Sequence, residues 1–117
     1  MNIPSPKEIH ALAVSKGWYD GVDVDHPELL PPDFFPAKLA LVHSELSEAL
    51  EAYRKHGLPL PWYEPTMGEG SIPEELADAV IRIMDLAGLL HIDLEAAIWA
   101  KHAYNQKRPY RHGGKVV

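Results

Sequence analysis

The chain has 117 residues, of which 46% are hydrophobic and 24% charged, and this composition fits one small globular domain, residues 1–117. Cysteine is absent, which excludes a disulfide framework, a thiolate metal site and a cysteine nucleophile. The formal net charge of -6 argues against the nucleic-acid backbone as the main partner. The longest apolar run is broken by Arg82 and Asp85, and the N-terminus lacks a charged-then-apolar signal pattern. We therefore expect a soluble, cytoplasmic protein with no membrane partner.

The sequence predicts helices separated by proline-rich breaks, because almost no stretch has the period-two alternation of a strand. The first helix is expected to begin after Ser5 and to end before Gly17. A loop follows over residues 17–32, and a second irregular segment, 58–70, carries Trp62 and Tyr63.

The second helix is predicted to start near Asp33 or Pro36 and to run to His56, where Gly57 is suited to a left-handed stop. Helical spacing of its apolar residues predicts one buried stripe. The stripe comprises Phe35, Leu39, Val42, Leu46, Ala49, Leu50 and Tyr53.

The third helix should begin with a capping box, in which the Ser71 hydroxyl and the Glu74 side chain each accept a backbone N–H, and should end near Leu90. Its predicted stripe comprises Leu76, Ala79, Val80, Ile83, Ala87 and Leu90. Because Ile81, Met84 and Leu89 lie off this stripe, we expect the helix to be buried centrally or shared with another subunit.

A fourth helix is predicted from the cap Asp93 to a residue before Pro109. The predicted fold is therefore all-α, a four-helix bundle completed by oligomerisation, and we expect a homodimer or a homotetramer. After this helix the sequence predicts an extended basic tail that includes His112 and Lys115.

Two pairs of acids carry the functional prediction. Glu45 and Glu48 lie about 60° apart on the second helix, and Glu75 and Asp78 repeat this spacing on the third. If these helices pack antiparallel, four carboxylates meet along one seam, where their mutual repulsion calls for a cation. A hard divalent ion such as Mg²⁺ prefers these oxygen ligands. Glu51 is rotated about 120° from Glu45 and is interpreted as a solvent-facing acid.

The order E-x-x-E, a spacer of 26 residues and E-x-x-D, present as "ELSE" and "ELAD", resembles the MazG-like all-alpha nucleoside triphosphate pyrophosphohydrolases. The downstream "KHAYNQKRPYRHGGK" is similar to the family's K-x-x-x-N-x-x-R segment, and the resemblance covers about residues 36–115. The chain departs from the fuller E-E-x-x-E signature at Ser44, which leaves open whether one or two metal ions bind.

The resemblance implies a Mg²⁺-dependent hydrolase, with Mn²⁺ as an alternative ion, that cleaves an NTP or dNTP to the monophosphate and pyrophosphate, in nucleotide-pool housekeeping. Carried over by position, Glu45, Glu48, Glu75 and Asp78 would hold the metal, and Glu48 is our choice for the catalytic base. Lys101, Asn105 and Arg108 match the nucleotide-contacting segment, and Tyr104, on the same face of the helix, is a further candidate for contact with the substrate.

Alternative interpretations remain open at this point. Acids at i,i+3 are usually a solvated face, and Asp85 is either an outer metal ligand or an ion-pair partner of Arg82. A di-iron bundle is a poor fit, because it needs Glu-x-x-His pairs. A non-enzymatic oligomeric helical adaptor with a degenerate site is the main rival. Trp18, Trp62 and Tyr63 are candidates for base stacking.

Overall fold

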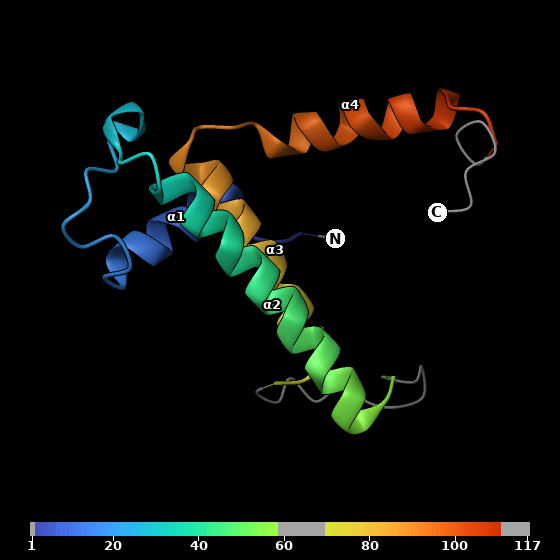
Figure 1. Ribbon diagram of the computed structural model, residues 1–117. Helices are drawn as coiled ribbons and strands as arrows, with labels where there is room; N and C mark the ends of the chain where they lie inside the picture. Colours follow the sequence, from blue (N-terminus) through green and yellow to red (C-terminus); the bar gives the residue numbers. More distant parts are fainter. Residues whose placement is uncertain (1, 59–69, 111–117) are drawn as a thin grey trace.

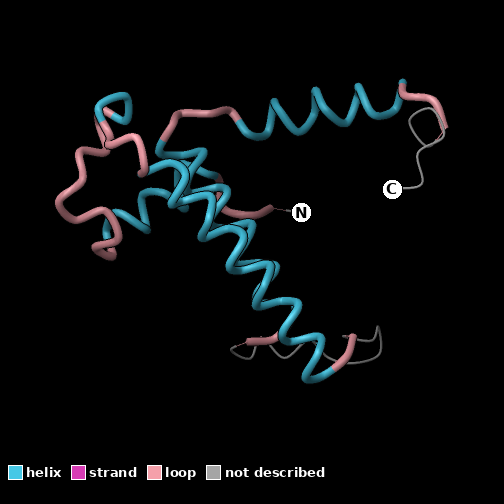
Figure 2. The backbone as a smooth tube through the Cα atoms, viewed as in Figure 1, coloured by secondary structure: helices cyan, strands magenta, loops and turns pink. Residues whose placement is uncertain are grey.

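The structure, a computed structural model, describes residues 2–58 and 70–110. Within these ranges every regular element is helical, which confirms the all-α prediction (Figures 1 and 2). The elements in chain order are α1 (Pro6–Ser15), the short 3-10 helix η1 (Pro27–Leu29), α2 (Phe34–His56), α3 (Ile72–Leu89) and α4 (Leu94–Lys107). None of the helices in the described part of the chain is long and apolar enough to cross a membrane.

The helix ends follow their local chemistry. The Ser5 hydroxyl accepts the backbone N–H of Glu8 at 3.1 Å, and Asp93 accepts that of Ala96 at 3.0 Å. Gly57 ends α2 with a φ of 73°, a conformation that glycine adopts at little cost.

The capping box at the start of α3 is only half formed. Ser71 accepts the N–H of Glu74 at 3.3 Å, as predicted. The Glu74 side chain, however, returns no bond within the described residues, and its Oε2 is buried without a hydrogen-bond partner. Ser71 alone therefore caps the helix.

Helix α3 is the central element, because α1 and α2 both pack against it and α2 runs antiparallel beside it (Figure 1). The buried core contains Tyr19, Leu86 and Leu89, and Leu89 is only 1% exposed. At Gly88 an added Cβ would lie 2.6 Å from the carbonyl oxygen of Pro6, so the absence of a side chain lets α1 approach α3 closely. The third helix is therefore central in the described chain, as the first of the two predicted alternatives states, although Ile81 stays 46% exposed; sharing with another subunit stays a prediction.

The predicted apolar stripes, in contrast, do not form most of the contact between α2 and α3, so this prediction is largely wrong. The face of α2 that packs on α3 includes the buried Glu45 and Ala52, and on α3 the buried face includes Glu75 and Ala79. The large apolar residues of both stripes are between about two-fifths and one-half exposed: Leu39, Leu46, Leu50 and Tyr53 on α2, and Leu76, Val80 and Ile83 on α3.

The reason is geometric. At 100° per residue, each of these exposed rows lies about 90–120° away from the buried face of its helix, so both rows emerge on one side of the α2–α3 pair. We call this side, made by Leu39, Leu46, Leu50, Tyr53, Leu76, Val80 and Ile83, the apolar face. Small alanines at the seam let the two helices pack closely while the leucines stay outside.

Helix α4 leads away from the other helices (Figure 1). All its residues from 95 to 107 are exposed, including Ile98 at 58% and Trp99 at 65%. The fourth helix is therefore present with its predicted ends, but within the described chain it does not pack as the fourth member of a bundle.

Candidate metal centre

Three of the four predicted metal ligands converge where α2 packs on α3. One carboxylate oxygen each from Glu45, Glu48 and Glu75 lies within 4.8 Å of the others. Glu45 and Glu75 are 6% and 7% exposed, whereas Glu48 is exposed at the rim. The antiparallel packing expected from the sequence therefore brings acids from both helices together, and we call these three residues the acid cluster.

The fourth predicted ligand, Asp78, lies one turn beyond Glu75 on α3 and is partly exposed. It is not a member of the group whose oxygens lie within 4.8 Å of one another. Ser44, which replaces the first acid of the family signature, donates its hydroxyl to the backbone carbonyl of Leu41 at 2.7 Å. Glu51 faces Arg54 at 3.7 Å on the exposed side of α2, in agreement with its assignment to solvent.

The acids of the cluster have different electrostatic environments. The Arg82 Nε donates to Glu45 Oε1 at 2.7 Å, and this ion pair lowers the pKa of Glu45. Burial raises the pKa of Glu75 to about 7, and hydrogen bonding to Glu48 and Glu45, which favours the protonated form, adds to the shift. The cluster therefore contains a carboxylate that stays ionised beside one that holds a proton near neutral pH.

One carboxylate oxygen of Glu75 has no hydrogen-bond partner in the described part of the chain. Its Oε2 is buried and forms no hydrogen bond within the described residues. Leaving a buried carboxylate oxygen unsatisfied costs free energy, roughly 1–3 kcal/mol for a typical polar group. A bound cation, coordinated by this oxygen, would remove this cost. The donor set, hard oxygens without sulfur or imidazole, fits Mg²⁺ or Mn²⁺.

The predicted ion pair between Asp85 and Arg82 is wrong, and Asp85 is not a member of the acid cluster; its role as an outer metal ligand stays a prediction. Its two carboxylate oxygens accept from the Tyr19 hydroxyl at 2.7 Å and hydrogen-bond to His10 Nδ1 at 2.8 Å. Arg82, its expected ion-pair partner, turns instead to Glu45. Asp85 thus ties α1 and the following loop to α3, and its physical role is structural. Burial and the hydrogen bond to Asp85 raise the pKa of Tyr19 well above its usual range.

The sequence could have revealed the role of Arg82. It lies seven residues after Glu75, which is two turns along the same face of α3, so it can reach the acid cluster. The interpretation from sequence paired it with the nearest acid on its own helix and missed Glu45 across the seam.

The predicted nucleotide-binding residues gather on α4, away from the acid cluster. The Lys101 Nζ lies 4.6 Å from the centre of the Tyr104 ring, and the guanidinium carbon of Arg108 lies 5.6 Å from it. Asn105 is on the same face by helical spacing. Within the described residues, none of these side chains forms an ion pair with the acid cluster. One face of α4 therefore presents two cations around an aromatic ring.

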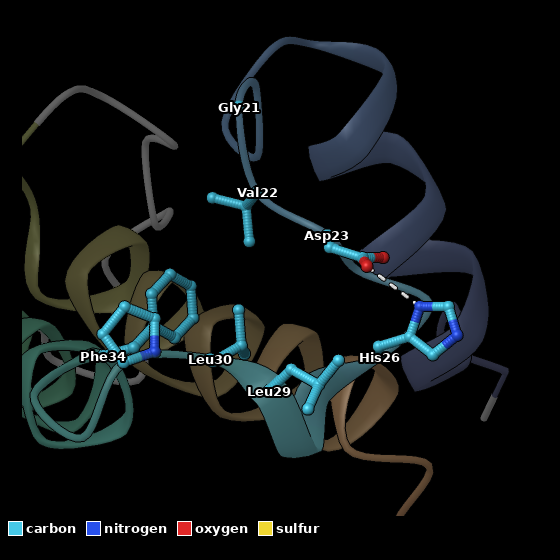
Figure 3. Close-up of a pocket in the computed structure, with 8 residues that line it drawn as sticks. Gly21, Val22, Asp23, His26, Leu29, Leu30 and Phe34 are labelled. Atoms are coloured by element: carbon cyan, nitrogen blue, oxygen red, sulfur yellow. Dashed lines mark hydrogen bonds and ion pairs between the residues drawn. The ribbon is translucent and has the colours of Figure 1, made fainter.

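A separate pocket of about 240 Å³ lies between α1 and α2, lined by residues of the intervening loop and by Phe34 (Figure 3). At its edge His26 Nδ1 hydrogen-bonds to Asp23 at 2.9 Å, which lowers the pKa of Asp23. The lining includes none of the three acids of the cluster. This pocket is not part of the candidate metal centre.

Trp18 is 71% exposed, and the other two aromatic candidates for base stacking, Trp62 and Tyr63, lie outside the described residues, as do His112 and Lys115. Comparisons with known protein families, with curated proteins and with solved structures gave no match to this chain.

Proposed function

We propose that the protein is a Mg²⁺-dependent nucleoside triphosphate pyrophosphohydrolase, which cleaves an NTP or dNTP to the monophosphate and pyrophosphate and serves nucleotide-pool housekeeping. One observation carries the proposal: carboxylates from two helices converge within 4.8 Å, and one oxygen of Glu75 is buried without a hydrogen-bond partner among the residues that the structure describes. This arrangement supports a cation site more strongly than a solvated acidic face, because solvent would satisfy that oxygen.

In the proposed site Glu45, Glu48 and Glu75 would hold the metal, and Asp78, one turn further along α3, is the fourth ligand that the resemblance implies. Bound Mg²⁺ supplies charge neutralisation and orientation of the triphosphate oxygens. Arg82 keeps Glu45 ionised and fixes its position through their 2.7 Å ion pair. The chain would thus supply the carboxylate ligands of the site.

The reaction needs a base and a stabiliser of the leaving group. The oxygen of a water molecule bonds to the α-phosphorus, the bond from this phosphorus to the oxygen bridging to the β-phosphate breaks, and pyrophosphate leaves. Glu48, the exposed acid of the cluster, would take the proton of the water with the carboxylate oxygen that does not bind the metal. The resemblance assigns Lys101 and Arg108, which lie away from the acid cluster in the described chain, to the charge on pyrophosphate, and we propose that Asn105 and Tyr104 contact the nucleotide.

Pyrophosphate release tests this proposal. The purified protein is incubated with a panel of canonical, deoxy and modified triphosphates, with Mg²⁺, with Mn²⁺ and with EDTA. We expect release that requires the metal, and a loss of at least about 100-fold in Glu75→Gln. Glu51→Gln, an acid on α2 outside the cluster, is the matched control and should keep full activity. Absence of release from every triphosphate would overturn the proposal.

A second candidate, a non-enzymatic oligomeric helical adaptor with a degenerate site, is favoured by the Arg82–Glu45 ion pair, which neutralises part of the acid cluster without a metal. Turnover of natural triphosphates, together with binding of a non-hydrolysable analogue, distinguishes the enzyme from the adaptor. An enzyme should turn over the natural triphosphate, and Mg²⁺ with the analogue should raise its melting temperature; an adaptor should bind without turnover.

A further inference from the structure

In the described part of the chain, Arg82 is the cationic side chain that forms an ion pair with the acid cluster. Its Nε donates to Glu45 Oε1 at 2.7 Å, across the contact between α2 and α3. Lys101 and Arg108, which the resemblance assigns to the substrate, lie on α4 and form no ion pair with the cluster within the described residues. An anionic ligand of the metal centre would therefore lie beside the guanidinium of Arg82.

The guanidinium of Arg82 has capacity for a second partner. It carries five N–H donors, and its bond to Glu45 uses the one on Nε. Asp78 and Asp85, its neighbours on α3, form no ion pair with it in the described chain, and the Arg82 side chain is 36% exposed. Exposed, coplanar N–H groups of this kind suit a phosphate, whose oxygens accept two parallel hydrogen bonds.

Glu45 would be shared by two cations once the metal centre is filled. Its carboxylate is paired with Arg82 and also belongs to the three whose oxygens converge within 4.8 Å. A carboxylate that coordinates a divalent ion has less negative charge left for a guanidinium, and two cations held close together repel each other. Coordination of the metal by Glu45 should therefore weaken its ion pair with Arg82.

A guanidinium released from Glu45 has a new acceptor within reach. Oxygen ligands lie about 2.1 Å from Mg²⁺ in an octahedron, so two oxygens bound to the same ion are about 3–4 Å apart. A phosphate oxygen on the metal would thus lie about that far from an oxygen of Glu45. Because Arg82 already reaches Glu45, a rotation of its exposed side chain is enough to reach the phosphate.

We propose that Arg82 exchanges partners when the substrate binds: it pairs with Glu45 in the metal-free protein and with a phosphate oxygen of the metal-bound triphosphate in the complex. The identity of this anion rests on the proposed function, whereas the exchange rests on the contacts of Arg82. The exchange makes Arg82 a substrate-binding residue. It also couples the two ligands, because Arg82 opposes the binding of Mg²⁺ alone and favours the binding of Mg²⁺ together with a triphosphate.

Two binding measurements test the exchange. Isothermal titration calorimetry at pH 8 gives the Kd of Mg²⁺ alone, and then the Kd of inorganic tripolyphosphate in saturating Mg²⁺, a probe that has the phosphates without a base. In Arg82→Gln the Kd of Mg²⁺ should fall about two- to fivefold, because a competing ion pair is lost. The Kd of tripolyphosphate should rise about tenfold to 100-fold, because a charge-assisted hydrogen bond is lost.

Opposite shifts for the two probes distinguish the exchange from a structural role. If Arg82 only held Glu45 in place, Arg82→Gln would weaken the binding of both probes, and that result would overturn the proposal. Unchanged binding of tripolyphosphate, or no binding of it to the wild-type protein, would overturn it as well. Arg82→Lys keeps a cation and should recover part of the tripolyphosphate affinity. Arg54→Gln is the matched control, because Arg54 pairs with Glu51 outside the cluster, and both its Kd values should equal those of the wild type.

The wild-type protein offers a direct readout that needs no turnover. In a ¹⁵N-labelled sample, the Nε–H resonance of Arg82, assigned by its loss in Arg82→Lys, should shift when Mg²⁺ is added and shift again when tripolyphosphate follows. A resonance that responds to neither addition would refute the exchange. Absence of pyrophosphate release from every triphosphate, with both shifts present, would instead overturn the proposed function and leave the contact with phosphate standing.

Discussion

Magnesium binding to the acid cluster should strengthen markedly between pH 6 and pH 8. The pKa of Glu75 is raised to about 7 by burial and by the neighbouring carboxylates, so near neutral pH this residue holds a proton that an incoming ion must displace. The pKa of Glu45 is lowered by Arg82, so Glu45 is ionised throughout this range and adds nothing to the pH dependence of Mg²⁺ binding.

The size of the effect follows from the pKa. With a value of about 7, roughly one-tenth of the Glu75 carboxyls are ionised at pH 6 and roughly nine-tenths at pH 8. The apparent Kd for Mg²⁺ should therefore fall about tenfold across this range. Binding should release about 0.9 proton per ion at pH 6 and about 0.1 at pH 8.

Isothermal titration calorimetry in two buffers of different ionisation enthalpy measures both the Kd and the number of protons released. Glu75→Gln should bind Mg²⁺ more weakly and with no such pH dependence, and Glu51→Gln should behave as wild type. A wild-type Kd that is constant from pH 6 to pH 8 would refute the reasoning.

Protonation of Glu75 also makes the stability of the metal-free protein depend on pH. Because the folded-state pKa of Glu75 is above its ordinary value of 4.5, the folded state binds more protons than the unfolded state between pH 4.5 and about 7. The free energy of unfolding should therefore decrease as pH rises through this window, and Mg²⁺ should restore it above pH 7. Urea unfolding in EDTA at pH 5 and pH 8 measures the difference, and Glu75→Gln should abolish this contribution. Glu45, with its lowered pKa, has the opposite sign and acts below pH 4.5.

Three substitutions test other parts of the structure. Leu89→Ala, at a side chain only 1% exposed, should lower the free energy of unfolding by about 2–5 kcal/mol in urea titrations, against less than about 0.5 kcal/mol for the exposed Leu29→Ala. Arg82→Ala leaves the buried Glu45 without its ion-pair partner and should destabilise the metal-free protein by about 1–3 kcal/mol. The same substitution should increase the rise in melting temperature that Mg²⁺ produces. An unchanged rise would contradict the role of Arg82. Asp85→Asn weakens the hydrogen bonds to Tyr19 and His10 and should cost about 1–3 kcal/mol, with the Kd for Mg²⁺ unchanged; weaker metal binding would return Asp85 to the site.

The local structure of this protein was predictable because it depends on neighbouring residues. Ser5 and Asp93 accept backbone N–H groups at helix starts, and Gly57 ends α2 with a positive φ, as expected from residue type and position. The convergence of Glu45, Glu48 and Glu75 was also predictable. Two i,i+3 pairs on consecutive antiparallel helices need only the helical period and one packing direction to meet.

The tertiary structure decided which faces of the helices are buried and what the ionic groups contact. The sequence pattern favours the largest apolar residues as the core, yet α2 meets α3 through alanines and two glutamates, while leucines such as Leu46 stay about half exposed. Arg82 forms an ion pair with Glu45 on α2, and Asp85 hydrogen-bonds to Tyr19 and His10 in the first part of the chain. Helix α4 has its predicted ends, but the turn at His91 directs it away from its own chain. Helical period and capping act between residues a few positions apart and are written in the sequence. Packing partners depend on distances between segments far apart along the chain, and only the folded arrangement determines those distances.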